Sequence, residues 1–128
     1  MFELKILTQF AAAHRLTMVS QKCENLHGHN WKVEVCVKGE KLNSAGVLID
    51  FSEIKAHVAK IVHELDHKFL NELPYFDNAP SSEKIAVHIA EHLQKKLAGT
   101  PVCVSRVAAW ESDSAVATYY PPEAGAQA

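Results

Sequence analysis

The sequence lacks any long apolar run, since no stretch approaches the ~20 residues that a membrane-spanning helix needs. Its first residues carry no basic flank, long apolar core or small-residue cleavage site, so they do not resemble a secretory signal. It has only three cysteines, and an odd number without a signal favours a reducing compartment. These absences predict a cytoplasmic protein with no membrane partner.

The chain also lacks an excess of positive charge and any internal repeat. Its 13 Lys and Arg against 15 Asp and Glu give a formal net charge of −2, so nucleic acid is not an expected partner. The 128 residues, 48% of them hydrophobic, suffice for one domain with its own core. We expect a single domain over residues 1–120 and a flexible tail over residues 121–128.

Histidine, by contrast, is plentiful, and its densest pattern is Cys23-x-x-x-His27-Gly-His29. Residues two apart in an extended segment point to the same side, so His27 and His29 can bind one ion together. Neutral imidazoles are good zinc ligands, and a catalytic zinc has three protein ligands and one open position. His14, at the end of the preceding predicted strand, is the candidate third ligand.

Cys23 has three possible roles at such a site. As a fourth zinc ligand it would close the site and make it structural. As a nucleophile or base it needs a lowered pKa, which a nearby cation or a hydrogen-bonded histidine can supply. The third possibility is an inert thiol, and the residues alone leave these alternatives open.

Alternation of apolar and polar residues predicts strands over residues 2–10 and about 30–38, and two more over 102–110 and 115–120. Asp50-Phe-Ser-Glu53 resembles a helix capping box. Apolar residues then recur at helical spacing: Ile54, Val58, Ile61, Val62, Leu65 and Phe69. Ser81 or Ser82 can cap a second amphipathic helix.

The predicted order is β-β-α-α-β-β. It indicates an α+β fold, in which a four-stranded antiparallel sheet carries two helices on one face. A sheet of this kind has edges that must be covered. Oligomerisation through those edges is therefore expected.

Two segments match zinc-peptidase patterns, since residues 63–67 read H-E-x-x-H and residues 88–92 read H-x-x-E-H. Such short motifs need a supporting structural context. On a regular helix, His63 and His67 would point away from the apolar stripe, so we favour a histidine-rich composition over a peptidase site.

Asp66 beside His67 is also typical of a proton-transfer pair, because a carboxylate orients an imidazole and stabilises its charged form. That role requires the helix to end near Leu65, or a neighbouring subunit to approach. Glu111, at the end of the third predicted strand, can accept two hydrogen bonds from an amino-pyrimidinone ring. Its alternative is an exposed strand-end charge.

Together the motifs resemble the 6-pyruvoyltetrahydropterin synthase family, in that family's order and over nearly the whole chain. They are Phe10-x-x-x-His14, Cys23-x-x-x-His27-Gly-His29, Leu65-Asp66-His67-x-x-Leu70-Asn71, Pro80-Ser-Ser-Glu83 and Trp110-Glu111-Ser. The spacing of three residues between Cys23 and His27 resembles that of the bacterial branch, the 6-carboxy-5,6,7,8-tetrahydropterin synthases of the queuosine pathway. The pyruvoyl-forming branch usually has two more residues there.

The resemblance implies a tunnelling fold (T-fold), in which three subunits join their sheets into a barrel and two trimers stack. It also implies a role for each matching residue. Zn²⁺ is held by His14, His27 and His29, and Cys23 is the acid/base thiol, tuned by Asp66 and His67. Glu111 anchors the pterin ring, and Ser81, Ser82 and Glu83 line its pocket.

The implied reaction converts 7,8-dihydroneopterin triphosphate to 6-carboxytetrahydropterin, with release of acetaldehyde and triphosphate. Two alternatives are a pyruvoyl-forming triphosphate lyase and, from another class, a non-catalytic zinc-binding module.

Overall fold

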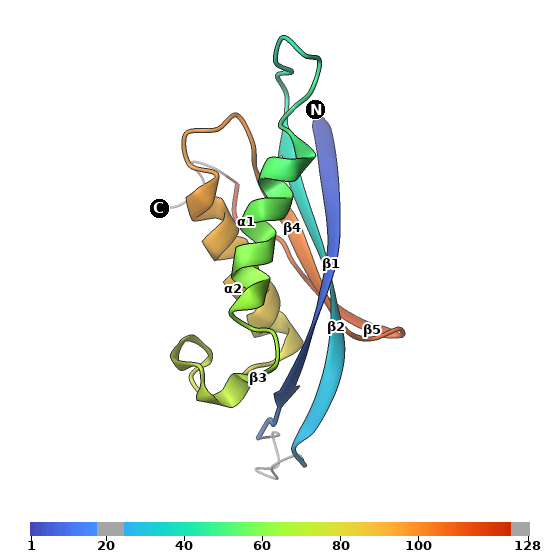
Figure 1. Cartoon of the computed structure of the whole chain (residues 1–128), viewed down its shortest axis with the longest axis vertical. Coiled ribbons are helices and arrows are strands. Elements are labelled where there is room, and N and C mark those ends of the chain that lie inside the picture. The colour runs from blue at the N-terminus through green and yellow to red at the C-terminus, as the bar shows by residue number, and fades with distance from the viewer. Residues whose placement is uncertain (18–24, 124–128) are drawn as a thin grey trace.

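The computed structural model describes residues 1–17 and 25–123. The strands β1 (Phe2–His14), β2 (His27–Gly39), β4 (Cys103–Ser112) and β5 (Ala115–Tyr119) form one sheet with a two-residue strand, β3 (Lys68–Phe69), in the order β3-β1-β2-β4-β5. The helices are α1 (Phe51–His63) and α2 (Ser82–Lys96), with 3₁₀ turns η1 (Leu70–Glu72) and η2 (Pro74–Phe76) between them. Both helices lie against the same face of the sheet (Figure 1). The predicted α+β fold is confirmed, with β3 as an added fifth strand.

β1 and β2 form the long antiparallel centre of the sheet. Their register pairs Phe10 with Trp31, Ala12 with His29 and His14 with His27. The side chains that face the helices are buried, among them Phe10, Trp31 and Val33. β1 runs past the alternating residues 2–10 to His14, since the alanines at positions 11–13 pair regularly with β2 although they show no polar alternation.

Both helices begin where their capping residues predicted. The Asp50 side chain accepts a hydrogen bond from the Ser52 N–H at the start of α1, and the Ser81 hydroxyl accepts one from the Lys84 N–H at the start of α2. The apolar faces of the helices pack onto the sheet, and their large buried apolar residues are Ile54, Val58, Ile61 and Val62 on α1 and Ile85, Ile89 and Leu93 on α2.

The apolar stripe of α1 ends earlier than its periodicity suggested. The helix stops at His63, so Leu65 is buried in the following turn and Phe69 belongs to β3. The reason is tertiary: β3 pairs in parallel with β1, and Asp66 binds the Ala11 N–H, which draws the chain out of the helical path.

None of the helices in residues 1–17 and 25–123 has the length and apolar character needed to cross a bilayer. In the predicted tail, Glu123 forms an ion pair with Lys38 at 2.7 Å, and residues 124–128 lie outside the described range.

Candidate metal centre

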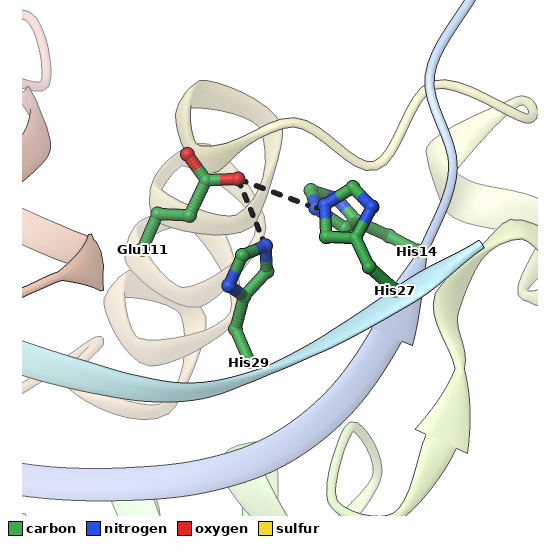
Figure 2. A group of neighbouring side chains, drawn as sticks. All are labelled: His14, His27, His29 and Glu111. Carbon is green, nitrogen blue, oxygen red and sulfur yellow. Dashed lines mark hydrogen bonds and ion pairs between the residues drawn. The ribbon is translucent and has the colours of Figure 1, made fainter. Parts of the chain in front are cut away.

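Four side chains meet at the end of the sheet where β1 ends and β2 begins. They are His14 from β1, His27 and His29 from β2 and Glu111 from β4, and their ligand atoms all lie within 4.8 Å of one another. Figure 2 shows the three imidazoles and the carboxylate directed toward a common centre. This group is the only cluster of three or more metal-capable side chains in the described part of the chain.

The register of the sheet produces this convergence. His14 pairs directly with His27, and His29 lies two residues further along β2, on the same face. β4 runs beside β2, with Trp110 opposite Lys32, which brings Glu111 to the same end of the same face. The ring centroids of the three histidines are 4.6, 4.6 and 5.0 Å apart.

The second nitrogens of two of these histidines contact backbone carbonyls. His14 Nδ1 lies 2.8 Å from the Pro80 oxygen, and His27 Nδ1 lies 2.7 Å from the Asn25 oxygen. A carbonyl can only accept, so each neutral ring carries its proton on Nδ1 and presents the Nε2 lone pair to the centre. Hydrogen bonds of this kind fix the tautomer of metal-binding histidines.

The arrangement fits a divalent cation. The two Nε2 atoms of His14 and His27 are 3.0 Å apart, and a Glu111 oxygen lies 3.4 Å from His14 Nε2 and 3.0 Å from His29 Nε2. With both lone pairs and a carboxylate pointing at one place, the acceptors repel one another unless a cation lies between them. Imidazole nitrogens with a carboxylate oxygen are a normal ligand set for zinc.

Trp31 packs against the centre from the core side. It is fully buried, and its ring contacts His14 and His29 edge to face, with centroids 5.2 Å from each. It also stacks on Phe10 at 6.1 Å. The imidazole rings of His14 and His29 are therefore held by the hydrophobic core as well as by the strands.

Asn71 is a residue of this region to which the sequence patterns assigned no role. Its Oδ1 accepts from the Arg15 N–H at 2.9 Å, and its Nδ2 donates to the Arg15 oxygen at 2.7 Å and to Asn78 Oδ1 at 2.7 Å. It thus joins the end of β1, next to His14, to the loop that leads to Pro80. The only sequence signal was its place in the Leu-Asp-His-x-x-Leu-Asn motif.

Asp66 and His67 lie just after α1, as the predicted proton-transfer role requires. His67 adopts a left-handed conformation with φ of 59°, its side chain is 82% exposed, and its Nδ1 lies 3.1 Å from Asp66 Oδ1. The Ala11 N–H donates to Asp66 Oδ1 at 2.9 Å, and this hydrogen bond lowers the pKa of the Asp66 carboxyl. His67 is outside the four-residue cluster but lines a shallow depression together with His29.

The other predicted site residues fall in different places. Ser81 caps α2, and Ser82 and Glu83 form the first turn directly after Pro80, whose carbonyl contacts His14. Their contribution to a pterin pocket stays a prediction. Cys23 lies outside the described residues, so its role also stays a prediction.

Neither peptidase-like pair belongs to the metal-capable cluster of the described residues. His67 is not helical, so residues 63–67 do not present two histidines from one helix face. On α2, the His92 Nδ1 bonds to the His88 oxygen of its own helix, and His88 is buried against Tyr75.

Comparison with known proteins agrees with this geometry. The model of the family described as 6-pyruvoyl tetrahydropterin synthase matches residues 3–122. The chain is 39% identical to a dihydroneopterin monophosphate aldolase of Pyrococcus furiosus, over 81% of this chain and 84% of the relative. It is 36% identical to a 6-carboxy-5,6,7,8-tetrahydropterin synthase of Synechocystis sp., over 88% of each. In fold it matches the 6-pyruvoyl tetrahydropterin synthase of Caenorhabditis elegans with a TM-score of 0.81 and 24% identity, over 94% of this chain and 96% of that one.

Proposed function

We propose that this chain, which belongs to the 6-pyruvoyl tetrahydropterin synthase family, is a zinc-dependent 6-carboxy-5,6,7,8-tetrahydropterin synthase. The family is a lyase-type enzyme family that acts on pterins. In this role it takes 7,8-dihydroneopterin triphosphate and supplies 6-carboxytetrahydropterin to queuosine biosynthesis in the cytoplasm.

One observation carries the metal-dependent part of this proposal. His14, His27 and His29 bring their ring nitrogens to one place, with the tautomers of His14 and His27 set by carbonyls so that the Nε2 lone pairs face inward. The choice of the carboxy product rests on the sequence, because three residues separate Cys23 from His27. The Synechocystis relative, named for that reaction, supports the same choice.

The proposed reaction consumes one water and gives 6-carboxytetrahydropterin, acetaldehyde and triphosphate. Zinc, when bound, supplies a Lewis acid that polarises oxygens of the substrate side chain. His14, His27 and His29 hold it, and Glu111 orients the ring through paired hydrogen bonds, so that the reacting carbons stay in place.

Proton transfer falls to Cys23 and to the Asp66–His67 pair. The Ala11 N–H stabilises the ionised form of Asp66, and the Asp66 carboxylate, 3.1 Å from His67 Nδ1, orients the imidazole. In the proposed mechanism, His67 accepts a proton from the substrate side chain, and Cys23 exchanges a second proton with that side chain. The bond changes are isomerisation of the side chain, loss of triphosphate and cleavage of one carbon–carbon bond.

Product analysis tests the proposal. The zinc-loaded protein is incubated with 7,8-dihydroneopterin triphosphate, and the products are identified by mass spectrometry. Acetaldehyde together with 6-carboxytetrahydropterin supports the carboxy synthase. A pyruvoyl product without an aldehyde identifies the pyruvoyl-forming lyase. Zinc binding without turnover of any dihydropterin identifies a non-catalytic module.

An aldolase is a second candidate, favoured by the 39% identity to the Pyrococcus protein of that name. Retro-aldol cleavage of the same side chain releases a two-carbon hydroxyaldehyde that still carries its phosphate. The same experiment, repeated with dihydroneopterin monophosphate, separates this activity from the synthases by the aldehyde that is formed.

We also propose that the protein works as a homo-oligomer, a trimer or a dimer of trimers. β3 and β5 are the edges of the sheet, and β5 presents its exposed Val116 at one of them. We expect light scattering coupled to size-exclusion chromatography to give the mass of three or six chains. The mass of a monomer at micromolar concentration would contradict the proposed oligomer.

A further inference from the structure

Glu111 occupies a position that the sequence did not assign to it. The carboxylate was expected to point at a substrate ring, whereas its Oε1 lies 3.0 Å from His29 Nε2 and 3.4 Å from His14 Nε2 (Figure 2). In a tetrahedral zinc site with bonds of about 2.0–2.1 Å, neighbouring ligand atoms are about 3.3 Å apart. The distances from the Glu111 oxygen to the two histidine nitrogens therefore match those expected between a fourth zinc ligand and its neighbouring ligands.

The backbone at Glu111 is irregular. β4 and β5 pair Trp110 with Val116 and Ser112 with Ala115, so Glu111 is the extra residue of a β-bulge. The extra residue of a bulge has no partner in the ladder. Glu111 lies two residues beyond Ala109, which pairs with the buried Val33, so the carboxylate faces the same side of the sheet as the histidines, and its side chain keeps 36% exposure.

The charge balance also favours a carboxylate at this place. His14 is 1% exposed, and three neutral imidazoles leave the full charge of a divalent ion in a largely buried setting. Burying an uncompensated charge is costly, and one carboxylate halves the net charge. Lys32 lies over the neighbouring Trp110 ring at 5.4 Å, on the other face of the sheet, and so does not neutralise Glu111.

We propose that Glu111 is the fourth ligand of the bound metal in the substrate-free protein, and that it leaves the metal when a pterin binds. This inference rests on the metal site of the proposed function. Four protein ligands make a closed site, and a catalytic site needs an open position. Since the ring anchor and the fourth ligand are the same carboxylate, pterin binding draws Glu111 to the ring and opens the metal to the substrate side chain.

The test is spectroscopic and does not depend on turnover. Co²⁺ replaces the metal, and the visible absorption and the Co²⁺ affinity are measured for the wild type, Glu111→Gln and Cys23→Ala. Glu34→Gln is the matched control, because Glu34 is a carboxylate of the same sheet that faces away from the helices and pairs with Lys5.

We expect an intense spectrum of a four-coordinate ion in the wild type, Glu34→Gln and Cys23→Ala. Glu111→Gln is expected to show an altered spectrum and a Co²⁺ affinity lower by about tenfold or more. Addition of 7,8-dihydroneopterin, which lacks the triphosphate leaving group, should change the wild-type spectrum and leave that of Glu111→Gln nearly unchanged.

Three results overturn the inference. Identical spectra and affinities for the wild type and Glu111→Gln mean that the carboxylate is not a ligand. A change confined to Cys23→Ala assigns the fourth position to the thiolate. A wild-type spectrum unaffected by saturating 7,8-dihydroneopterin means that Glu111 does not leave the metal. None of these three results changes the outcome of the product assay, so rejection of Glu111 as the fourth ligand is distinct from rejection of the proposed function.

Discussion

Asn71 holds both backbone polar groups of Arg15, with hydrogen bonds of 2.9 Å to its N–H and 2.7 Å to its oxygen. Residue 15 directly follows His14, so a side chain from η1 holds the end of the strand that carries this candidate metal ligand. The same amide binds Asn78, in the loop whose Pro80 carbonyl orients the His14 ring. Asn71 is therefore placed to fix the position of His14 in the metal-capable cluster.

This relationship predicts that Asn71→Ala weakens metal binding without removing any ligand. Partners that orient a ligand typically account for 10–100-fold in metal affinity, and we expect a loss of about tenfold. Competition with a chromophoric chelator measures the affinity. Asn43→Ala is the control, because Asn43 also accepts from two backbone N–H groups, those of Ala45 and Val47, in a loop outside the cluster. Equal zinc affinity in the two variants would contradict the positioning role.

The three histidines are predicted to be separately required for stoichiometric zinc. Each of His14→Ala, His27→Ala and His29→Ala removes one imidazole of the cluster, and we expect a fall in zinc affinity of at least about 100-fold, measured by elemental analysis and chelator competition. His63→Ala, which alters the peptidase-like pattern on an exposed position, should keep one zinc per chain. Zinc lost from His63→Ala and retained in His27→Ala would assign the metal to the other segment.

Cys23 is predicted to act on protons beside the metal. Cys23→Ala should reduce turnover of 7,8-dihydroneopterin triphosphate by about 100-fold or more, as removal of a general acid or base does, and should keep its zinc. Cys23→Ser, which retains a weak donor, should recover only part of the rate. Loss of zinc in both variants would make the thiol a ligand.

His88 is predicted to make folding stability depend on pH. Burial, with repulsion from His92 as a smaller cause, lowers the pKa of His88 from 6.5 to about 4, and its Nε2 has no hydrogen-bond partner in residues 1–17 and 25–123. Between these values the unfolded chain binds the proton and the folded chain does not. The free energy of unfolding therefore falls as the pH drops from about 6.5 toward 4, by roughly 1–3 kcal/mol in total.

Urea denaturation at pH 7, 6 and 5 measures this dependence. His88→Phe preserves an aromatic ring against Tyr75 and removes the titrating group, so its free energy of unfolding should change less over the same range. Carboxyls with lowered pKa, such as Asp66, contribute to both proteins and cancel in the difference. Parallel profiles for the two proteins would show that His88 is not the source.

Much of the fold followed from local patterns, because period and capping are properties of neighbouring residues. The alternation in β2, the Asp50 cap and the Ser81 cap placed these elements to within a few residues. The failures lie where distant contacts decide. β3 has only two residues and forms by pairing with β1, and α1 stops before Leu65 because Asp66 bonds to Ala11. No local pattern carries that information.

The candidate metal ligands show the same division. His27 and His29 were paired by their spacing, which is enough because a strand places alternate residues on one side. His14 required the additional assumption that the two strands are antiparallel neighbours, and the observed register of His14 with His27 agrees with it. The place of Glu111 against these histidines depends on the register of β4 with β2, which the sequence of β4 does not reveal.

By itself, the sequence predicted the order of the two helices and the four longer strands, the two-histidine pair and the family motifs. Each of these depends on residues close together in the chain or on their order. Only the tertiary structure decided that Glu111 lies against the histidines, that the Pro80 carbonyl sets the tautomer of the His14 ring, and that Asn71 holds the end of β1. These contacts depend mainly on register and on loop paths between segments up to ~100 residues apart, which are set when the whole sheet packs under its helices.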